Sequence, residues 1–260
     1  MSDPIETWLD LPTFGVFACL TVVYGATALA ILWICFGRLC GPRVKRFDGV
    51  VAPFFTSVSV MFALLTGFLA SDIADRNRQA ARAVQGEAAE LRNIYTLSVA
   101  SASDMSHIRA SWGVYVRAAI ADDWPAMARG DGADSVGAAY DKLLHDVSDP
   151  RIASDSSVAV HAALLNATVR LGTARSERLA IASDNTSDLK WAVVLILGII
   201  TQIAIGAVHL TKPRAQIAAL AIFSVAVIVS LGLVALQEHP FAGDVHIGPD
   251  LIRALLKLED

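Results

Sequence analysis

The sequence predicts an all-α, polytopic membrane protein with four transmembrane helices and a helical extramembrane domain inserted between the second and third. Hydrophobic residues make up 55% of the 260 residues, which is too apolar for a soluble domain of this length. Four apolar stretches lack Asp, Glu, Lys and Arg, and each is long enough to cross a hydrocarbon core of ~30 Å. They cover 11–36, 50–70, 191–209 and 216–236.

The stretches are grouped two and two around a mostly polar insert, and this grouping predicts four segments. Residues 1–70 hold an N-terminal tail and the first two spans, 71–188 form the extramembrane domain, 189–237 hold the last two spans, and 238–260 are a C-terminal tail. The lipid bilayer is therefore the first expected partner.

Charged residues around the spans predict an orientation. The short loops after the first and third spans are basic, whereas the N-terminal tail is acidic. The cations are Arg38, Arg43, Lys45, Arg46, Lys212 and Arg214, and the acids are Asp3, Glu6 and Asp10. By the positive-inside rule both loops are cytoplasmic, so both termini and residues 71–188 are expected on the outer side of the membrane.

The insert is expected to be helical throughout. The second span should continue as one helix to about residue 99, because 71–85 contain neither Gly nor Pro. Apolar residues at helical spacing predict its buried face: Ile73, Ala80, Val84, Leu91 and Ile94. Further helices are expected over 103–127, with a kink or new turn at Pro125, and over 136–147 and 154–182, with a loop at 129–135. Leu251, Leu255 and Leu258 predict a last amphipathic turn in the tail.

Signals for enzyme chemistry are weak in this sequence. No two histidines stand at i, i+4, and Cys19, Cys35 and Cys40 all lie in or just after the first span, so no metal site is predicted. There is no glycine-rich phosphate loop, serine nucleophile elbow or aromatic and basic nucleic-acid surface. We expect no catalytic residues, no cofactor and no nucleic-acid partner.

Two polar patterns lie within the spans. Gln202 stands between Gly198 and Gly206 on one helical face, which favours close helix packing with the amide as a hydrogen-bonding group over ligand binding. On the second span Thr56, Ser59, Ala63, Thr66 and Ala70 form a stripe of small and hydroxyl residues, with Phe55 and Phe62 beside it. The stripe is either a tight helix–helix seam or the lining of a pore, and spacing alone favours the seam.

Several short motifs follow one another along nearly the whole chain. They are Asp48, the Ala-Leu-Leu-x-x-Phe run ending at Phe68, Glu87, the run Asp123, Trp124, Pro125, Ala126 and Met127, then Arg175, Arg178 and Leu179, and finally Pro240, Phe241 and Gly243. In these motifs and their order the chain resembles the bestrophin-like family of bacterial four-span membrane proteins. Similarity to this family implies a multi-pass protein of the bacterial inner membrane.

More distant similarity to the true bestrophins implies a pentameric channel whose second helices line an anion pore. On that resemblance Phe55, Thr56, Ser59, Phe62, Ala63 and Thr66 would line the pore, with Phe62 at a constriction. The expected activity is passive, anion-preferring conduction of small inorganic ions by a homo-oligomer. The tail after Pro240 lacks the dense acidic run of a calcium clasp, and the predicted orientation also differs. The alternative is a non-conducting envelope scaffold or sensor whose outer domain binds a partner.

One structural ion pair is also expected. Glu87 lies 17 residues after Ala70, and Arg175 and Arg178 lie 16 and 13 residues before Trp191. At ~1.5 Å per helical residue all three reach a similar height of ~20–25 Å above the membrane. Glu87 is therefore predicted to pair with one of the two arginines, against the alternative of three separate solvated charges.

Overall fold

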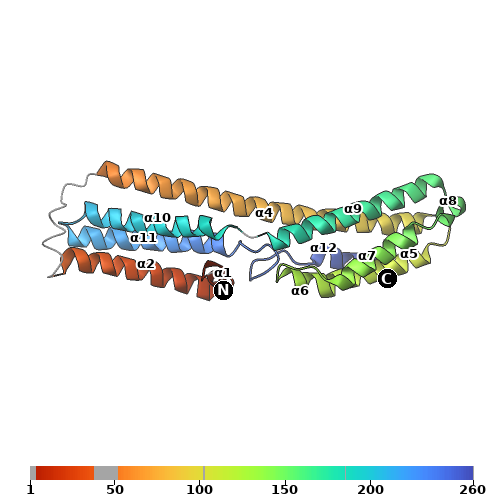
Figure 1. Ribbon diagram of the computed structural model, residues 1–260, viewed down its shortest axis with the longest axis horizontal. Helices are drawn as coiled ribbons and strands as arrows, with labels where there is room; N and C mark the ends of the chain where they lie inside the picture. Colours follow the sequence, from red (N-terminus) through yellow and green to blue (C-terminus); the bar gives the residue numbers. More distant parts are fainter. Residues whose placement is uncertain (1–3, 38–51, 102, 185, 260) are drawn as a thin grey trace. The chain divides into compact units, whose positions relative to one another are not determined.

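A computed structural model describes residues 4–37, 52–101, 103–184 and 186–259, and within these ranges the secondary structure is helical with no strand (Figure 1). The all-α prediction is confirmed. Several residues used in the sequence argument lie outside the described ranges: Asp3, Arg38, Cys40, Arg43, Lys45, Arg46 and Asp48.

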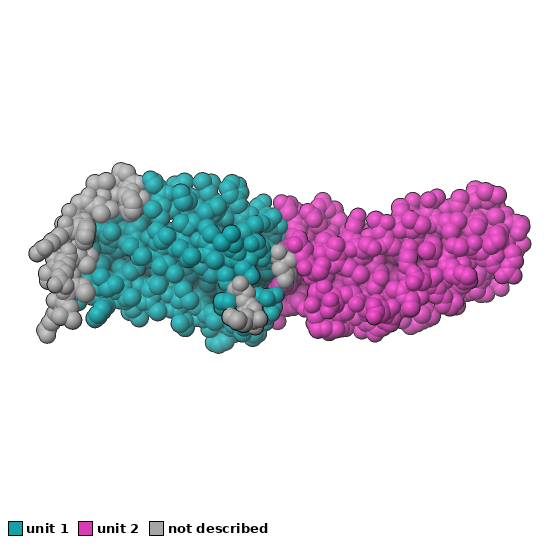
Figure 2. All heavy atoms as spheres, in the orientation of Figure 1, with its two compact units in different colours: residues 1–74, 186–238 teal, residues 75–185, 239–260 magenta. Residues whose placement is uncertain are grey.

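The chain divides into two compact units, coloured separately in Figure 2. The first comprises residues 1–74 and 186–238, and the second comprises 75–185 and 239–260. Helix α4 (Ala52–Ala100) begins in the first unit and ends in the second. Among the described residues, four helices are long and apolar enough to cross a membrane, as the sequence predicts.

The first unit is a helical bundle. A short helix, α1 (Pro4–Leu9), precedes α2 (Thr13–Phe36), and the unit also holds the first part of α4, α10 (Asp188–Val208) and α11 (Pro213–Ala235). Its core joins residues of all these helices: Leu9, Val16, Leu20, Tyr24, Leu69, Ile73, Trp191, Val194, Val227, Leu231 and Ala235. Gly232 lies so close to the ring of Phe17 that no β-carbon would fit, which lets α2 and α11 approach closely.

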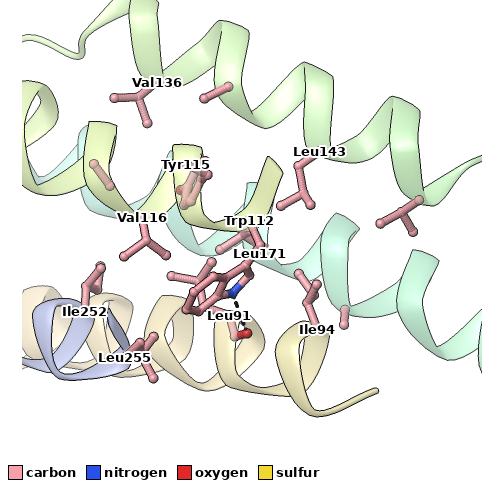
Figure 3. Packing of buried hydrophobic residues seen from close by; sticks show 14 of the residues in the cluster. Leu91, Ile94, Trp112, Tyr115, Val116, Val136, Leu143, Leu171, Ile252 and Leu255 are labelled. Atoms are coloured by element: carbon pink, nitrogen blue, oxygen red, sulfur yellow. Dashed lines mark hydrogen bonds between the residues drawn. The ribbon is translucent and has the colours of Figure 1, made fainter. Parts of the chain in front are cut away.

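The second unit packs α4 against α5 (Ser106–Ala118), α7 (Asp134–Val147) and α9 (Val158–Ser183) around one hydrophobic core (Figure 3). The predicted buried positions Ala80, Val84, Leu91 and Ile94 are each at most 1% exposed, and Ile73 is equally buried in the first unit. Trp112 fills the centre and donates from Nε1 to the Leu91 carbonyl at 2.8 Å. The predicted core face of this helix is confirmed.

The expected helix over 103–127 is instead divided into three parts. Helix α5 ends at Ala118, a π-helical turn covers Ala119–Asp123, and α6 covers Trp124–Met127. The Trp124 amide bonds to the Ala119 carbonyl, five residues back. Pro125 has no N–H to bond to the carbonyl four residues before it, and its ring would clash with that carbonyl in an α-helix, so a wider turn relieves the clash.

One other expectation on helix boundaries needs correction. The prediction of a single helix over 154–182 is wrong, because the chain breaks between two helices in this range. Helix α8 (Arg151–Asp155) ends at Asp155, and α9 starts only at Val158. The Ser157 side chain accepts a hydrogen bond from the Val160 amide and thereby caps α9.

The tail packs in the second unit through α12 (Asp250–Arg253) and a 3₁₀ turn (Ala254–Leu258). Ile252 and Leu255 join its core, whereas Leu251 is 49% exposed, so the predicted apolar face was misplaced at its first position. The physical reason is the 3₁₀ geometry, whose three residues per turn bring Ile252 and Leu255 onto one side.

Candidate functional site

The small-residue stripe of α4 does not lie on a single side of the first unit. Thr56 and Ala63 are exposed, whereas Ser59, Thr66 and Ala70 are partly buried. The hydroxyl oxygens of Ser59 and Thr66 are enclosed by the protein and have no hydrogen-bond partner among the described residues. The stripe thus lies across the boundary between the covered and the outward face of the helix.

The two phenylalanines beside the stripe are partly buried. The ring of Phe62 packs against Phe223 of α11, with ring centroids 5.9 Å apart and planes tilted by 58°. Phe55 lies on the same partly covered side, one and two turns before Ser59 and Phe62. The chain therefore turns Phe62 toward its own bundle, while the outward side of α4 carries Thr56 and Ala63.

Gln202 connects three helices of the first unit. Its side-chain amide donates to the Tyr24 carbonyl at 3.0 Å and to Ser224 Oγ at 2.8 Å, and its Oε1 accepts from Thr27 Oγ1 at 2.6 Å. On the same helix, Gly198 lies against the ring of Tyr24 and Gly206 lies against Ile31, and these two neighbours belong to α2. The amide is thus fully used in packing α10 against α2 and α11, which leaves it no group to offer a ligand.

A buried ion-pair network lies in the second unit, between α4, α9 and the π-helical turn. The guanidinium of Arg178 donates from Nε to Glu87 Oε2 at 2.6 Å and from Nη2 to Glu87 Oε1 at 3.1 Å. Both side chains are 0% exposed. Tyr115 also donates to Glu87 Oε1 at 2.7 Å. The structure therefore brings Glu87 together with Arg178 and not with Arg175.

Asp123 completes this network, and sequence reasoning gave it no role. Arg175 donates to both of its carboxylate oxygens at 2.9 and 3.0 Å, and Arg178 Nη2 donates to Oδ2 at 2.9 Å. The Ala133 amide adds a bond to Oδ1 at 2.9 Å. The π-helical turn ends at Asp123, and this turn was the missing signal, since a regular helix would present residue 123 differently.

Two acids and two arginines make the network formally neutral, and every charge in it is paired. The remaining surface of the Arg178 guanidinium faces Trp124, whose ring centroid lies 4.5 Å from Cζ, and Nη1 lies 2.9 Å from the Met127 sulfur. Such a network has no open coordination position or free nucleophile. It is therefore suited to fixing helices rather than to chemistry.

The pKa values follow from these contacts. Burial alone would raise the pKa of the Asp123 carboxyl, but the hydrogen bonds from Arg175 and Ala133 and the nearby guanidinium charges outweigh burial and hold it below its usual value. Burial would lower the pKa of Arg178, but the Glu87 carboxylate reverses this and raises it. Burial, reinforced by Glu87, raises the pKa of the Tyr115 hydroxyl well above its usual value.

A third buried acid lies three residues after the end of α11. Glu238 is 1% exposed and accepts hydrogen bonds from the Thr186 amide at 2.9 Å and from Trp191 Nε1 at 3.0 Å. Its carboxylate thus receives one donor from the segment that leads into α10 and one from the first turn of that helix. The sequence did not predict its burial, because an acid directly after an apolar span is normally interpreted as a water-exposed residue at the membrane surface.

Comparison with known protein families identifies the family of the chain. Residues 22–252 match the family model of the Bestrophin-like domain, which is most of the chain. The chain belongs to the bestrophin-like family. No curated protein is similar enough in sequence to count as a relative.

Solved structures support the same fold for this bestrophin-like protein. A crystal structure of a bacterial bestrophin homologue from Klebsiella pneumoniae has a TM-score of 0.68 at 12% identity, covering 89% of this chain and 97% of that one. A variant of that homologue reaches 0.72 at 12% identity, with 95% and 97% coverage. Another structure, of a membrane protein, reaches 0.72 at 10% identity, with 93% and 98% coverage. The bestrophin fold therefore extends over nearly the whole chain.

Proposed function

We propose that this bestrophin-like protein is a passive ion channel that prefers anions, formed by a homo-oligomer in which α4 lines the pore. Membership in the bestrophin-like family is the observation that carries the proposal. The pentamer of the true bestrophins is the favoured assembly. The bacterial inner membrane is the proposed location, with both termini and residues 71–188 outside.

The residues of the membrane segments support conduction over active transport. Pumps and ion-coupled transporters usually need an ionisable group within the bilayer. In this chain, α2, the part of α4 between Phe55 and Ala70, and the apolar parts of α10 and α11 hold no Asp, Glu, Lys or Arg. A path lined by hydroxyls and small apolar groups permits passive flow with hydrophobic narrowing.

Within α4 we assign the lining to the outward Thr56 and Ala63, flanked by Ser59 and Thr66. The two flanking hydroxyls have no hydrogen-bond partner in the described part of the chain, so a small rotation of α4 would turn oxygens toward passing ions at little cost in broken bonds. Phe55 and Phe62 then act as the constriction, Phe62 by leaving its contact with Phe223.

The proposal is tested with the purified full chain in liposomes, measuring chloride and potassium flux, with oligomer size checked by gel filtration. We expect Phe62→Ala to raise conductance and Thr66→Leu to reduce it, with assembly intact. Phe223→Ala is the matched control, because it removes the same ring contact from the α11 side. An equal effect of Phe223→Ala would mean that packing, and not a constriction, is responsible.

The scaffold alternative makes the opposite forecast. If α4 serves only as a seam, Thr66→Leu crowds the packed helices and disturbs the oligomer, and neither variant creates or abolishes a current. A correctly assembled wild type that carries no current across voltage and ionic conditions would overturn the channel and favour the scaffold.

A further inference from the structure

The part of α4 in the second unit has one covered and one exposed side. Glu87, Leu91 and Ile94 lie on the covered side, at 0% exposure. The opposite side carries exposed polar residues at helical spacing, and these are Arg78, Arg82, Gln85, Arg92, Asn93 and Thr96. An amphipathic helix with one charged side is ordinary, so the sign and pairing of the charges decide what this side can do.

Two of these arginines have no counter-charge. Arg78 pairs with Asp75, one turn earlier on the same helix. Of the two other acids on this part of the helix, Glu87 is buried with Arg178, and Glu90 is bound by Arg170 of α9 at 2.7 Å. Arg82 and Arg92 are exposed, and their side chains have neither an ion pair nor a hydrogen bond within the described residues. This side of α4 is therefore positive although the whole chain has a formal net charge of −4.

We infer that Arg82 and Arg92 form an anion-attracting surface on the extramembrane part of α4 that sets the charge preference of the channel. The inference depends on the proposed function, since it requires α4 of several copies to surround the ion path. In that assembly the two arginines of each copy add their potentials, which concentrates small inorganic anions and repels cations.

The guanidinium is suited to this role. It stays charged at any physiological pH, and its weakly held hydration shell lets an anion approach and leave quickly. Exposed arginines act through their field rather than through a closed binding pocket, and this field is screened over about 8 Å at 0.15 M salt and about 3 Å at 1 M. A surface of this kind raises the local anion concentration without trapping the ion.

The test compares reversal potentials of wild type and variants in liposomes or planar bilayers with asymmetric KCl. We expect Arg82→Gln with Arg92→Gln to lower the chloride-to-potassium permeability ratio about tenfold in low salt, and Arg82→Glu with Arg92→Glu to invert the preference. Replacement of both by Lys should preserve it. The effect should shrink in 1 M salt.

The matched control removes the same two charges elsewhere, by Arg151→Gln with Arg253→Gln. Both residues are exposed, at 82% and 56% of the side chain, and neither lies on α4. The control should leave the reversal potential unchanged. The single variants Arg82→Gln and Arg92→Gln each give a partial shift and replace the double variant if it fails to assemble.

Different outcomes would refute the proposed function and the anion-attracting surface. No current from assembled wild type would refute the proposed function. A wild type that conducts, together with glutamate variants that assemble and show an unchanged reversal potential, would refute the anion surface alone. An equal shift in the Arg151 and Arg253 control would also refute it, because the effect would then come from overall charge.

Discussion

Glu87 and Arg178 illustrate how one pair of residues can hold together two segments that are distant in the sequence. The pair joins α4 to α9 across 91 residues of sequence, and both side chains are fully buried. Taking two charges out of water costs several kcal/mol each, and only good geometry with additional hydrogen bonds compensates. Tyr115 and Asp123 supply those bonds here.

Removal of one partner should therefore be far more harmful than removal of both. We expect Arg178→Leu to lower the free energy of unfolding by about 3–5 kcal/mol, because Glu87 is left as a buried unpaired charge. Adding Glu87→Leu should restore part of the loss, since Arg175 and Asp123 still neutralise each other. Thermal or denaturant unfolding in detergent measures both.

The control for this pair is Arg170→Gln, which breaks the Glu90 ion pair on the same two helices. Arg170 is 60% exposed, so this variant should cost no more than about 1 kcal/mol. If Arg178→Leu costs no more than this control, the buried network does not stabilise the unit.

Asp123 makes stability depend on pH in a predictable direction. The pKa of its carboxyl is below the usual value in the folded state, so its contribution is complete above the unfolded pKa of about 3.9 and is lost as the pH falls through the folded pKa. The stability difference between wild type and Asp123→Asn should be constant above about pH 5 and should shrink below about pH 4. Denaturant titrations from pH 7 to pH 3 measure it.

Asp149→Asn is the reference for that titration. The Asp149 carboxyl has its pKa lowered to about 2 by hydrogen bonds from Arg151, but it lies on the surface. Its variant should therefore show a much smaller stability difference at every pH. A difference between wild type and Asp123→Asn that stays the same down to pH 3 would contradict the role assigned to the charged carboxylate.

At the scale of elements, long patterns were predictable and local exceptions were not. The four spans and the buried face of α4 follow from apolar runs and from helical spacing, which average over many residues. The π-helical turn before Pro125 and the break at Ser157 each depend on one or two hydrogen bonds. Such bonds are decided by tertiary contacts, so the sequence offers only the proline or the serine as a hint.

The candidate site also has features that the sequence predicts and features that depend on tertiary contacts. Counting residues along the helices predicts that Glu87 and the two arginines lie at a similar height. Which arginine pairs with Glu87, and how Asp123 takes part, depend on how α9 is rotated against the π-helical turn. On α4, spacing placed Thr56, Ser59 and Thr66 on one stripe. Which edge of that stripe the bundle covers is set by Phe223 on another helix.

At the scale of the whole molecule, the orientation in the membrane determines where the second unit works. The cations of the two short loops predict that those loops are cytoplasmic and that residues 71–188 lie outside. The resemblance to the true bestrophins implies the opposite orientation, with the large domain in the cytosol. Only Lys212 and Arg214 of these loop cations lie in the described part of the chain, where both are exposed in or next to the turn between α10 and α11. The two orientations would put the Arg82 and Arg92 surface at opposite ends of the proposed ion path.

Cysteine labelling on intact cells distinguishes the two orientations. In a background with Cys19, Cys35 and Cys40 replaced by Ala, we expect Asp131→Cys to react with a membrane-impermeant maleimide and Lys212→Cys to react only after lysis. Both positions are exposed. The neighbouring Gly132 is less suitable, because a β-carbon there would lie 2.9 Å from Leu179 Cδ1. Labelling of position 212 in intact cells, with position 131 protected, would reverse the topology and place the second unit in the cytoplasm.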